Sequence, residues 1–130
     1  MMNKVVHFEL PSEDRERARN FYALVFGWGM EDMPHKDDVY TFAITTEVDD
    51  HFMHTEKGAI NGGIFKRDSA VQHPVVTIEV PSIDDHVKLI EQAGGQLVVP
   101  KGEVPDMGYY AYFRDPEGNV MGLWENKMKG

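Results

Sequence analysis

The strongest constraint on the fold is an internal repeat, because both halves of this 130-residue chain carry one strand, one helix and three strands in the same order. Glu9-Leu10-Pro11-Ser12 corresponds to Glu79-Val80-Pro81-Ser82, and Gly63-Ile64-Phe65 corresponds to Gly122-Leu123-Trp124. The first half is longer because it carries an extra polar loop near His51. Repeated units normally bury their apolar faces against one another. The sequence therefore predicts an α+β fold of two βαβββ modules, with a curved, mostly antiparallel sheet, helices outside and a cleft inside.

The first half begins with an alternating strand at residues 5–10, which places His7 and Glu9 on the face opposite Phe8. A helix follows the acidic segment 12–14 and stops at Gly27, a favourable C-terminal cap. Its apolar stripe consists of Ala18, Phe21, Tyr22, Val25 and Phe26. We expect three of these, Ala18, Phe21 and Val25, to be buried beneath the sheet. Further strands are expected at residues 28–33, ending at Pro34, and at 39–45 and 59–66, with an exposed loop between the last two.

The second half repeats this order with a strand at residues 75–80, a helix and a strand at 96–100. Ser82 and Asp85 have capping-box spacing at the start of the helix, whose buried stripe includes Val87 and Ile90. Two aromatic strands at 108–114 and 119–125 surround the turn Asp115-Pro116-Glu117-Gly118, in which Gly118 tolerates a positive φ. The hairpin is either entirely core or lines a cavity with one face. The predicted domain is single and covers residues 1–130, with module one at 1–70 and module two at 71–130.

Composition excludes several classes of function. A net charge of −9 argues against nucleic-acid binding, since phosphates reward Lys and Arg. It favours cationic or neutral ligands. No cysteine is present for a disulfide or thiolate chemistry, and no apolar run is long enough to span a membrane. The N-terminal residues lead directly into a strand, so we expect no signal peptide and a cytoplasmic protein.

The arrangement resembles the vicinal oxygen chelate superfamily, which includes glyoxalase I, bleomycin-resistance proteins and extradiol dioxygenases. The resemblance covers nearly the whole chain and rests on these residues: His7, Asp14, Phe21-Tyr22, Gly27, Ile78, Val80, Gly94-Gly95 and Asp115-Pro116-Glu117-Gly118-Asn119. It implies the glyoxalase-like half-barrel fold and a homodimer.

The resemblance also implies four cleft-facing positions that hold a divalent metal in some relatives. Here they are occupied by His7, Gly63, Val75 and Gly122, of which His7 alone has a lone pair to offer. The expected result is that no metal is bound, with His7 a weak candidate ligand. A relocated site built from His7, Glu9 and Glu79 is the alternative. Without metal, Glu9 and Glu79 are candidates for proton transfer, with His7 as a third catalytic candidate.

Three functions are consistent with these residues. The first is metal-free binding of a small apolar or aromatic molecule, with a cation as one option, in the manner of bleomycin-resistance proteins. The second is a metal-dependent, lactoylglutathione-lyase-like enzyme or a dioxygenase with a rearranged metal site, and the third is a partner-binding module. The predicted ligand-binding residues are His7, Glu9, Gly63, Thr77, Tyr110, Tyr112, Gly122 and Trp124. His51 and His54 are interpreted as a solvated loop pair, and His35, His73 and His86 as surface residues.

Overall fold

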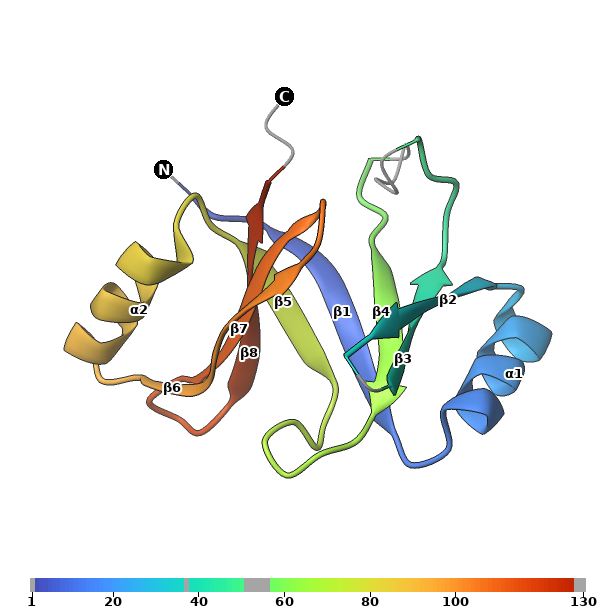
Figure 1. Cartoon of the computed structure of the whole chain (residues 1–130), viewed down its shortest axis with the longest axis horizontal. Helices are drawn as coiled ribbons and strands as arrows, with labels where there is room; N and C mark the ends of the chain where they lie inside the picture. Colours follow the sequence, from blue (N-terminus) through green and yellow to red (C-terminus); the bar gives the residue numbers. More distant parts are fainter. Residues whose placement is uncertain (1, 37, 51–56, 128–130) are drawn as a thin grey trace. The chain divides into compact units, whose positions relative to one another are not determined.

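The computed structural model describes residues 2–36, 38–50 and 57–127, and it divides into two compact units. The first module is His7–Pro74, and the second module is Met1–Val6 with Val75–Gly130. In Figure 1 the first module carries the labels β1 to β4 and α1, and the second carries β5 to β8 and α2. The prediction of a single domain over residues 1–130 stays a prediction.

The first module contains β1 (Val5–Ser12, from His7 onward), α1 (Arg15–Phe26), β2 (Gly29–His35), β3 (Asp38–Ile44) and β4 (Asn61–Lys66). Its strands lie in the order β2-β3-β4-β1. The pairs β2–β3 and β3–β4 are antiparallel, whereas β1 and β4 are parallel. Strand β2 runs through Pro34, where the sequence predicted its end. Proline is tolerated there because β2 has a paired neighbour on one side within the module, so the missing N–H need not break the ladder.

The second module contains β5 (Val75–Glu79), α2 (Ile83–Gln92), β6 (Gln96–Val104), β7 (Gly108–Arg114) and β8 (Val120–Asn126). Its order is β5-β8-β7-β6, with β5 parallel to β8 and the other neighbours antiparallel. In each module, then, the first strand runs parallel to the last strand. The predicted α+β class, the βαβββ repeat and the mostly antiparallel pairing are confirmed.

Helix α2 covers an apolar core, as the sequence predicted. Ser82 caps the helix by accepting a hydrogen bond from the backbone N–H of Asp85. Ile83 is fully buried and packs in a core whose buried members are Val80, Ile83, Ala111 and Leu123. Val87 and Ile90 are partly buried against this core. One face of strands β7 and β8 therefore packs against α2. The residues that alternate with these packed residues along each strand point to the other face.

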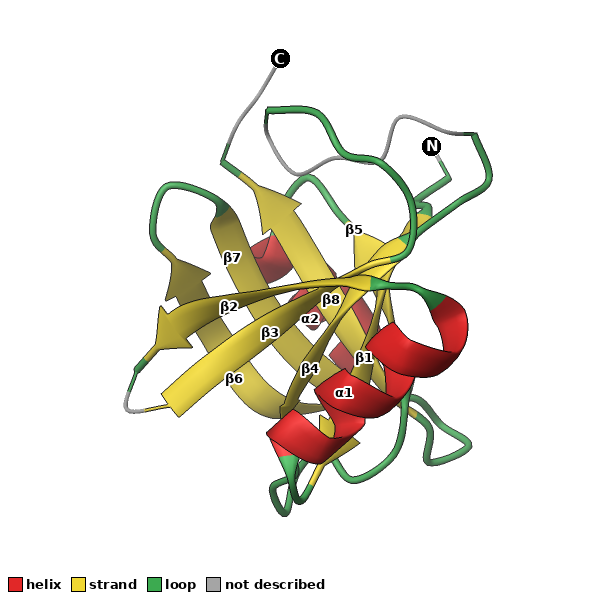
Figure 2. Ribbon diagram, turned by 90° about the vertical axis from the view of Figure 1, so that its right-hand side faces the viewer, coloured by secondary structure: helices red, strands yellow, loops and turns green. Residues whose placement is uncertain are grey.

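Helix α1 forms where predicted, with Asp14 as its N-cap and Gly27 in the left-handed region at φ 72°. Its burial differs from the prediction, because Phe21 is 52% exposed, Val25 is 53% exposed, and Ala18 is half-buried. The helix contacts the sheet through an aromatic stack instead: the rings of Tyr22 and Trp28 lie 4.9 Å apart, and Trp28 packs on Phe8. Figure 2 shows α1 lying against the strands of its own module.

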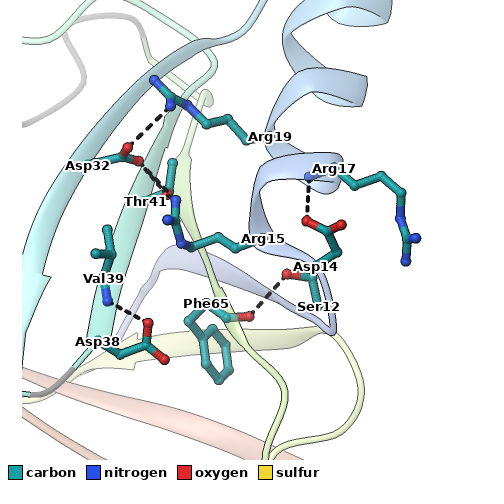
Figure 3. A network of polar contacts seen from close by, with 10 residues as sticks. All are labelled: Ser12, Asp14, Arg15, Arg17, Arg19, Asp32, Asp38, Val39, Thr41 and Phe65. Atoms are coloured by element: carbon teal, nitrogen blue, oxygen red, sulfur yellow. Dashed lines mark hydrogen bonds and ion pairs between the residues drawn. The ribbon is translucent and has the colours of Figure 1, made fainter.

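A polar network attaches α1 to β2 and β3 (Figure 3). The Arg15 guanidinium donates to Thr41 Oγ1 at 2.7 Å and lies 3.2 Å from Asp32, and Arg19 reaches the other oxygen of Asp32 at 3.2 Å. Thr41 is fully buried and donates its own hydroxyl proton to Asp32 at 2.6 Å. The network fixes Thr41 on the helix-facing side of β3, so its neighbour Tyr40 must face the opposite side of the strand.

Candidate functional site

The candidate site in the first module is a hydrogen-bonded group of His7, Tyr40 and Glu9, here called the His7–Tyr40–Glu9 relay. His7 and Glu9 occupy alternate positions on β1, opposite Phe8, whose ring packs on Trp28. His7 Nε2 lies 2.9 Å from the Tyr40 hydroxyl oxygen, and that hydroxyl donates to Glu9 Oε2 at 2.6 Å. The strand order β3-β4-β1 brings these three side chains together across β4.

Burial gives the relay its electrostatic character. Glu9 is 7% exposed, and a buried carboxyl group needs hydrogen-bond donors to compensate for lost hydration. The short bond from Tyr40 supplies one such donor. His7 is half-buried, and burial lowers its pKa from 6.5 to about 4, so that its imidazole is neutral at pH 7. The relay therefore combines an uncharged imidazole, a phenol and a buried acid.

Gly63 makes room for Tyr40. It pairs with Glu9 on one side and with Phe42 on the other. A Cβ atom at position 63 would lie 1.8 Å from the Tyr40 hydroxyl oxygen, so no larger residue fits while Tyr40 keeps this rotamer. Gly63 is one of the predicted ligand-binding residues, and that role stays a prediction. The phenol ring beside it also stacks on Phe65 at 6.3 Å.

The second module carries the other predicted ligand-binding residues on one face of its sheet, away from α2. Thr77 pairs with Gly122, Tyr112 also pairs with Gly122, and Tyr110 pairs with Trp124. Tyr110 and Tyr112 both face this way, because Tyr109, Ala111 and Phe113 pack on the helix side. Glu79, the partner of Trp124 on β5, shares this face by alternation, whereas Glu125 accepts a hydrogen bond from the N–H of Ile83 at the start of α2.

Glycines fit closely against this face as well. A Cβ at Gly122 would lie 2.6 Å from Thr77 Oγ1, and one at Gly108 would lie 2.6 Å from the Trp124 ring. Thr77 is itself buried at 6% exposure. The side chains on this face can therefore occupy their positions only because the residues beside them are glycines. Its residues remain predicted ligand contacts.

The described part of the chain offers no ready ligand set for a divalent metal ion. Among residues 2–36, 38–50 and 57–127, no three His, Asp or Glu side chains are grouped in a way that could hold one. His7 Nε2 is engaged by Tyr40, Gly63 is covered by the same ring, and Val75 has no donor atom. A metal ion held by His7 Nε2 would require Tyr40 to leave its place. His51 and His54 lie outside the described residues.

Three further histidines in the described part of the chain, His35, His73 and His86, are not members of the relay. The exposed His73 precedes the first residue of β5, and His86 hydrogen-bonds Asn3 and the Ser82 carbonyl oxygen. Burial and the nearby Lys36 lower the pKa of His35. An open groove at the start of α1 is lined by residues such as Ser12, Arg17 and Arg67, and the relay residues are not part of it. It is a surface hollow flanked by charged side chains.

Sequence reasoning missed Tyr40, which it assigned to no specific role. Alternation along the strand predicts that Tyr40 and Thr41 face opposite sides. The proximity of Tyr40 to β1, however, depends on the position of β4 between β3 and β1. A signal was available in the adjacent glycines at 62 and 63, since glycine within a strand often marks the close approach of another group.

The fold and these two faces define a glyoxalase-type protein, and the comparisons agree. Residues 4–123 match the Glyoxalase/Bleomycin resistance protein/Dioxygenase superfamily, so the chain belongs to this family. A protein of Mycobacterium bovis named "Putative glyoxylase CFP32" is 29% identical over 122 residues, covering 90% of this chain and 43% of the relative. The chain thus spans less than half the length of this curated relative.

Solved structures share the fold at low sequence identity. The hypothetical protein BH1468 from Bacillus halodurans aligns with a TM-score of 0.67 and 16% identity over 100% of this chain and 99% of that one. Methylmalonyl-CoA epimerase from Mycobacterium tuberculosis aligns with a TM-score of 0.64 and 14% identity, covering 95% and 88%. Neither described helix has the length and apolar composition needed to cross a membrane.

Proposed function

We propose that this chain binds a small, largely apolar or aromatic molecule and recognises its polar part with the His7–Tyr40–Glu9 relay, without a metal ion. The observation that carries the proposal is the 2.6 Å bond from Tyr40 to the buried Glu9, in the space left by Gly63. Keeping a carboxyl group buried costs free energy. Such groups cluster at functional sites more often than at purely structural positions.

The ligand chemistry follows from the side chains available. A carboxylate and a net charge of −9 favour a cation over an anion. Within the first module, the Tyr40 ring lies 5.4 Å from the Phe42 ring and 6.3 Å from the Phe65 ring, so rings for stacking and for cation–π contact lie beside the relay. Small-molecule sites usually combine mostly apolar walls with a few polar groups in this way. Cytoplasmic residence and homodimer formation stay predictions from the sequence.

Thermal shift with a panel of cationic aromatic compounds tests this proposal. A ligand present at about 100 times its dissociation constant stabilises the folded state by about 2.7 kcal/mol. We expect Glu9→Gln and Phe42→Ala, both in the first module, to lose most of the shift, while Tyr109→Ala, which lies in the second module against α2, keeps it. If no compound stabilises the wild type, or if all three variants respond alike, the proposal is wrong.

Proton transfer by Glu9 is the second candidate function. It is favoured by the buried position of this carboxyl group beside a neutral imidazole, and by the presence of epimerases among proteins of the same fold. Deuterium incorporation from D2O into methylmalonyl-CoA is a direct assay. Exchange that requires Glu9 and survives chelation would support this candidate. Exchange lost on chelation would instead favour the metal-dependent lyase or dioxygenase alternative.

A further inference from the structure

The direction of the hydrogen bonds in the relay is fixed by counting protons. A tyrosine hydroxyl has one proton to donate and can accept further bonds at oxygen. Tyr40 gives its proton to Glu9 at 2.6 Å. The contact between Tyr40 and His7 at 2.9 Å must then use a proton on Nε2. A neutral imidazole carries one N–H, so Nδ1 of His7 is unprotonated.

We propose that Tyr40 and Glu9 lock His7 in the Nε2–H tautomer, so that its Nδ1 lone pair selects ligands that present a hydrogen-bond donor. This inference deepens the proposed function and rests on it for the presence of a ligand. Tyr40 is accordingly a specificity-determining residue that acts through His7. The tautomer lock itself is a property of the ligand-free protein.

The Nδ1 atom is available for such a contact. It makes no hydrogen bond within the part of the chain that the structure describes. His7 is half-buried and not fully buried, so part of its surface stays exposed. Burial keeps the pKa of His7 near 4, which leaves Nδ1 unprotonated at neutral pH.

The chemical class of the ligand follows from this polarity. Nδ1 and the Glu9 carboxylate both accept hydrogen bonds, so the relay complements an N–H or O–H group such as that of an amine, an amidinium, an indole or a phenol. A ligand acceptor such as an ether or carboxylate oxygen would face the lone pair of Nδ1 and leave Nδ1 without a hydrogen-bond donor. Unpaired polar groups are the usual source of strong rejection between otherwise similar ligands.

The tautomer lock is tested without any ligand, by the ¹⁵N chemical shifts of the histidine rings at pH 7. The His7 signals are assigned from their loss in His7→Gln. We expect a protonated Nε2 and a pyridine-type Nδ1 in the wild type, and a mixture of tautomers in Tyr40→Phe, which removes one oxygen atom. A protonated Nδ1 in the wild type, or an unchanged tautomer in Tyr40→Phe, would overturn the inference.

The selection of donors is tested with indole and benzofuran, which share one shape but present N–H and ring oxygen respectively. Wild type is expected to bind indole about fivefold more tightly, the factor for one net hydrogen bond. The ratio should approach one in Tyr40→Phe. Equal affinities in the wild type would contradict the inference. Failure of both probes and of the cationic panel would instead refute the proposed function, while the ¹⁵N shifts still decide the tautomer.

Discussion

Replacing Gly63 with alanine would place a methyl carbon 1.8 Å from the Tyr40 hydroxyl oxygen and 2.1 Å from the nearest atom of its ring. These distances are far below van der Waals contact, so the ring must rotate away and abandon both of its hydrogen bonds. One of them goes to the buried Glu9 and is worth about 1.5–3 kcal/mol, and the other, to His7, adds about 1 kcal/mol. We expect Gly63→Ala to lower the free energy of unfolding by about 3 kcal/mol.

Equilibrium unfolding in urea measures this loss, and two further variants isolate its cause. Gly29→Ala is the matched control, because its new Cβ would lie 3.6 Å from the Ile44 side chain, an ordinary contact. It should change stability by less than ~1 kcal/mol. In a Tyr40→Ala background the clash is absent, so Gly63→Ala should cost much less there. A cost below ~1 kcal/mol in the wild type, or an equal cost in both backgrounds, would refute this explanation.

Four further predictions concern protonation, metal, packing and assembly. The pKa of folded His7 is about 4, below its unfolded value of 6.5, so its contribution to stability is complete above pH 6.5 and is lost as the pH falls towards 4. Urea titrations should show a loss of up to about 3 kcal/mol that is absent in His7→Gln. Elemental analysis of purified protein should find no stoichiometric Ni, Zn, Mn or Fe, and one tightly bound ion lost in His7→Ala would contradict this. Phe21→Ala should cost less than ~1.5 kcal/mol, since the side chain is half exposed, and a cost of ~3–5 kcal/mol would indicate a core residue. Light scattering should give the mass of a dimer at micromolar concentration, and a monomer would count against the assembly expected from the family.

Local signals predicted the elements well. Strand β7 has the bounds read from the sequence, and the Ser82 cap and the left-handed Gly118 at φ 87° occupy their expected places. These features depend on neighbouring residues, where capping and turn chemistry act. Alternation also placed Trp124 and Glu125 on opposite faces of β8. Period-two patterns survive folding because a one-residue slip would expose a whole apolar face.

Contacts that depend on strand order could not be read in the same way. Tyr40 and Glu9 are brought together by the pairing of β3 and β1 with β4, and no local pattern encodes that register. The exposure of Phe21 was missed for a related reason. An apolar stripe on a helix shows which side faces the sheet, but the depth of burial depends on which side chains of the sheet contact the helix. Here the sheet offers Thr41 and Asp32, which hold α1 through arginines in addition to the aromatic contact of Tyr22 with Trp28.

The close fit between glycines and bulky side chains has a consequence for protein engineering. Gly62 faces Phe8, Gly63 faces Tyr40, Gly102 faces Tyr110 and Gly108 faces Trp124, each at a distance that no added carbon could tolerate. The space available to each side chain is therefore set jointly by the glycine and the bulky residue that faces it. A mutant library that randomises one position at a time samples mostly steric clashes or cavities. Randomising both members together opens combinations in which the ring comes from the opposite strand. Under the proposed function, such exchanges would change the shape of the ligand-contacting surface while the space beside each ring stays filled.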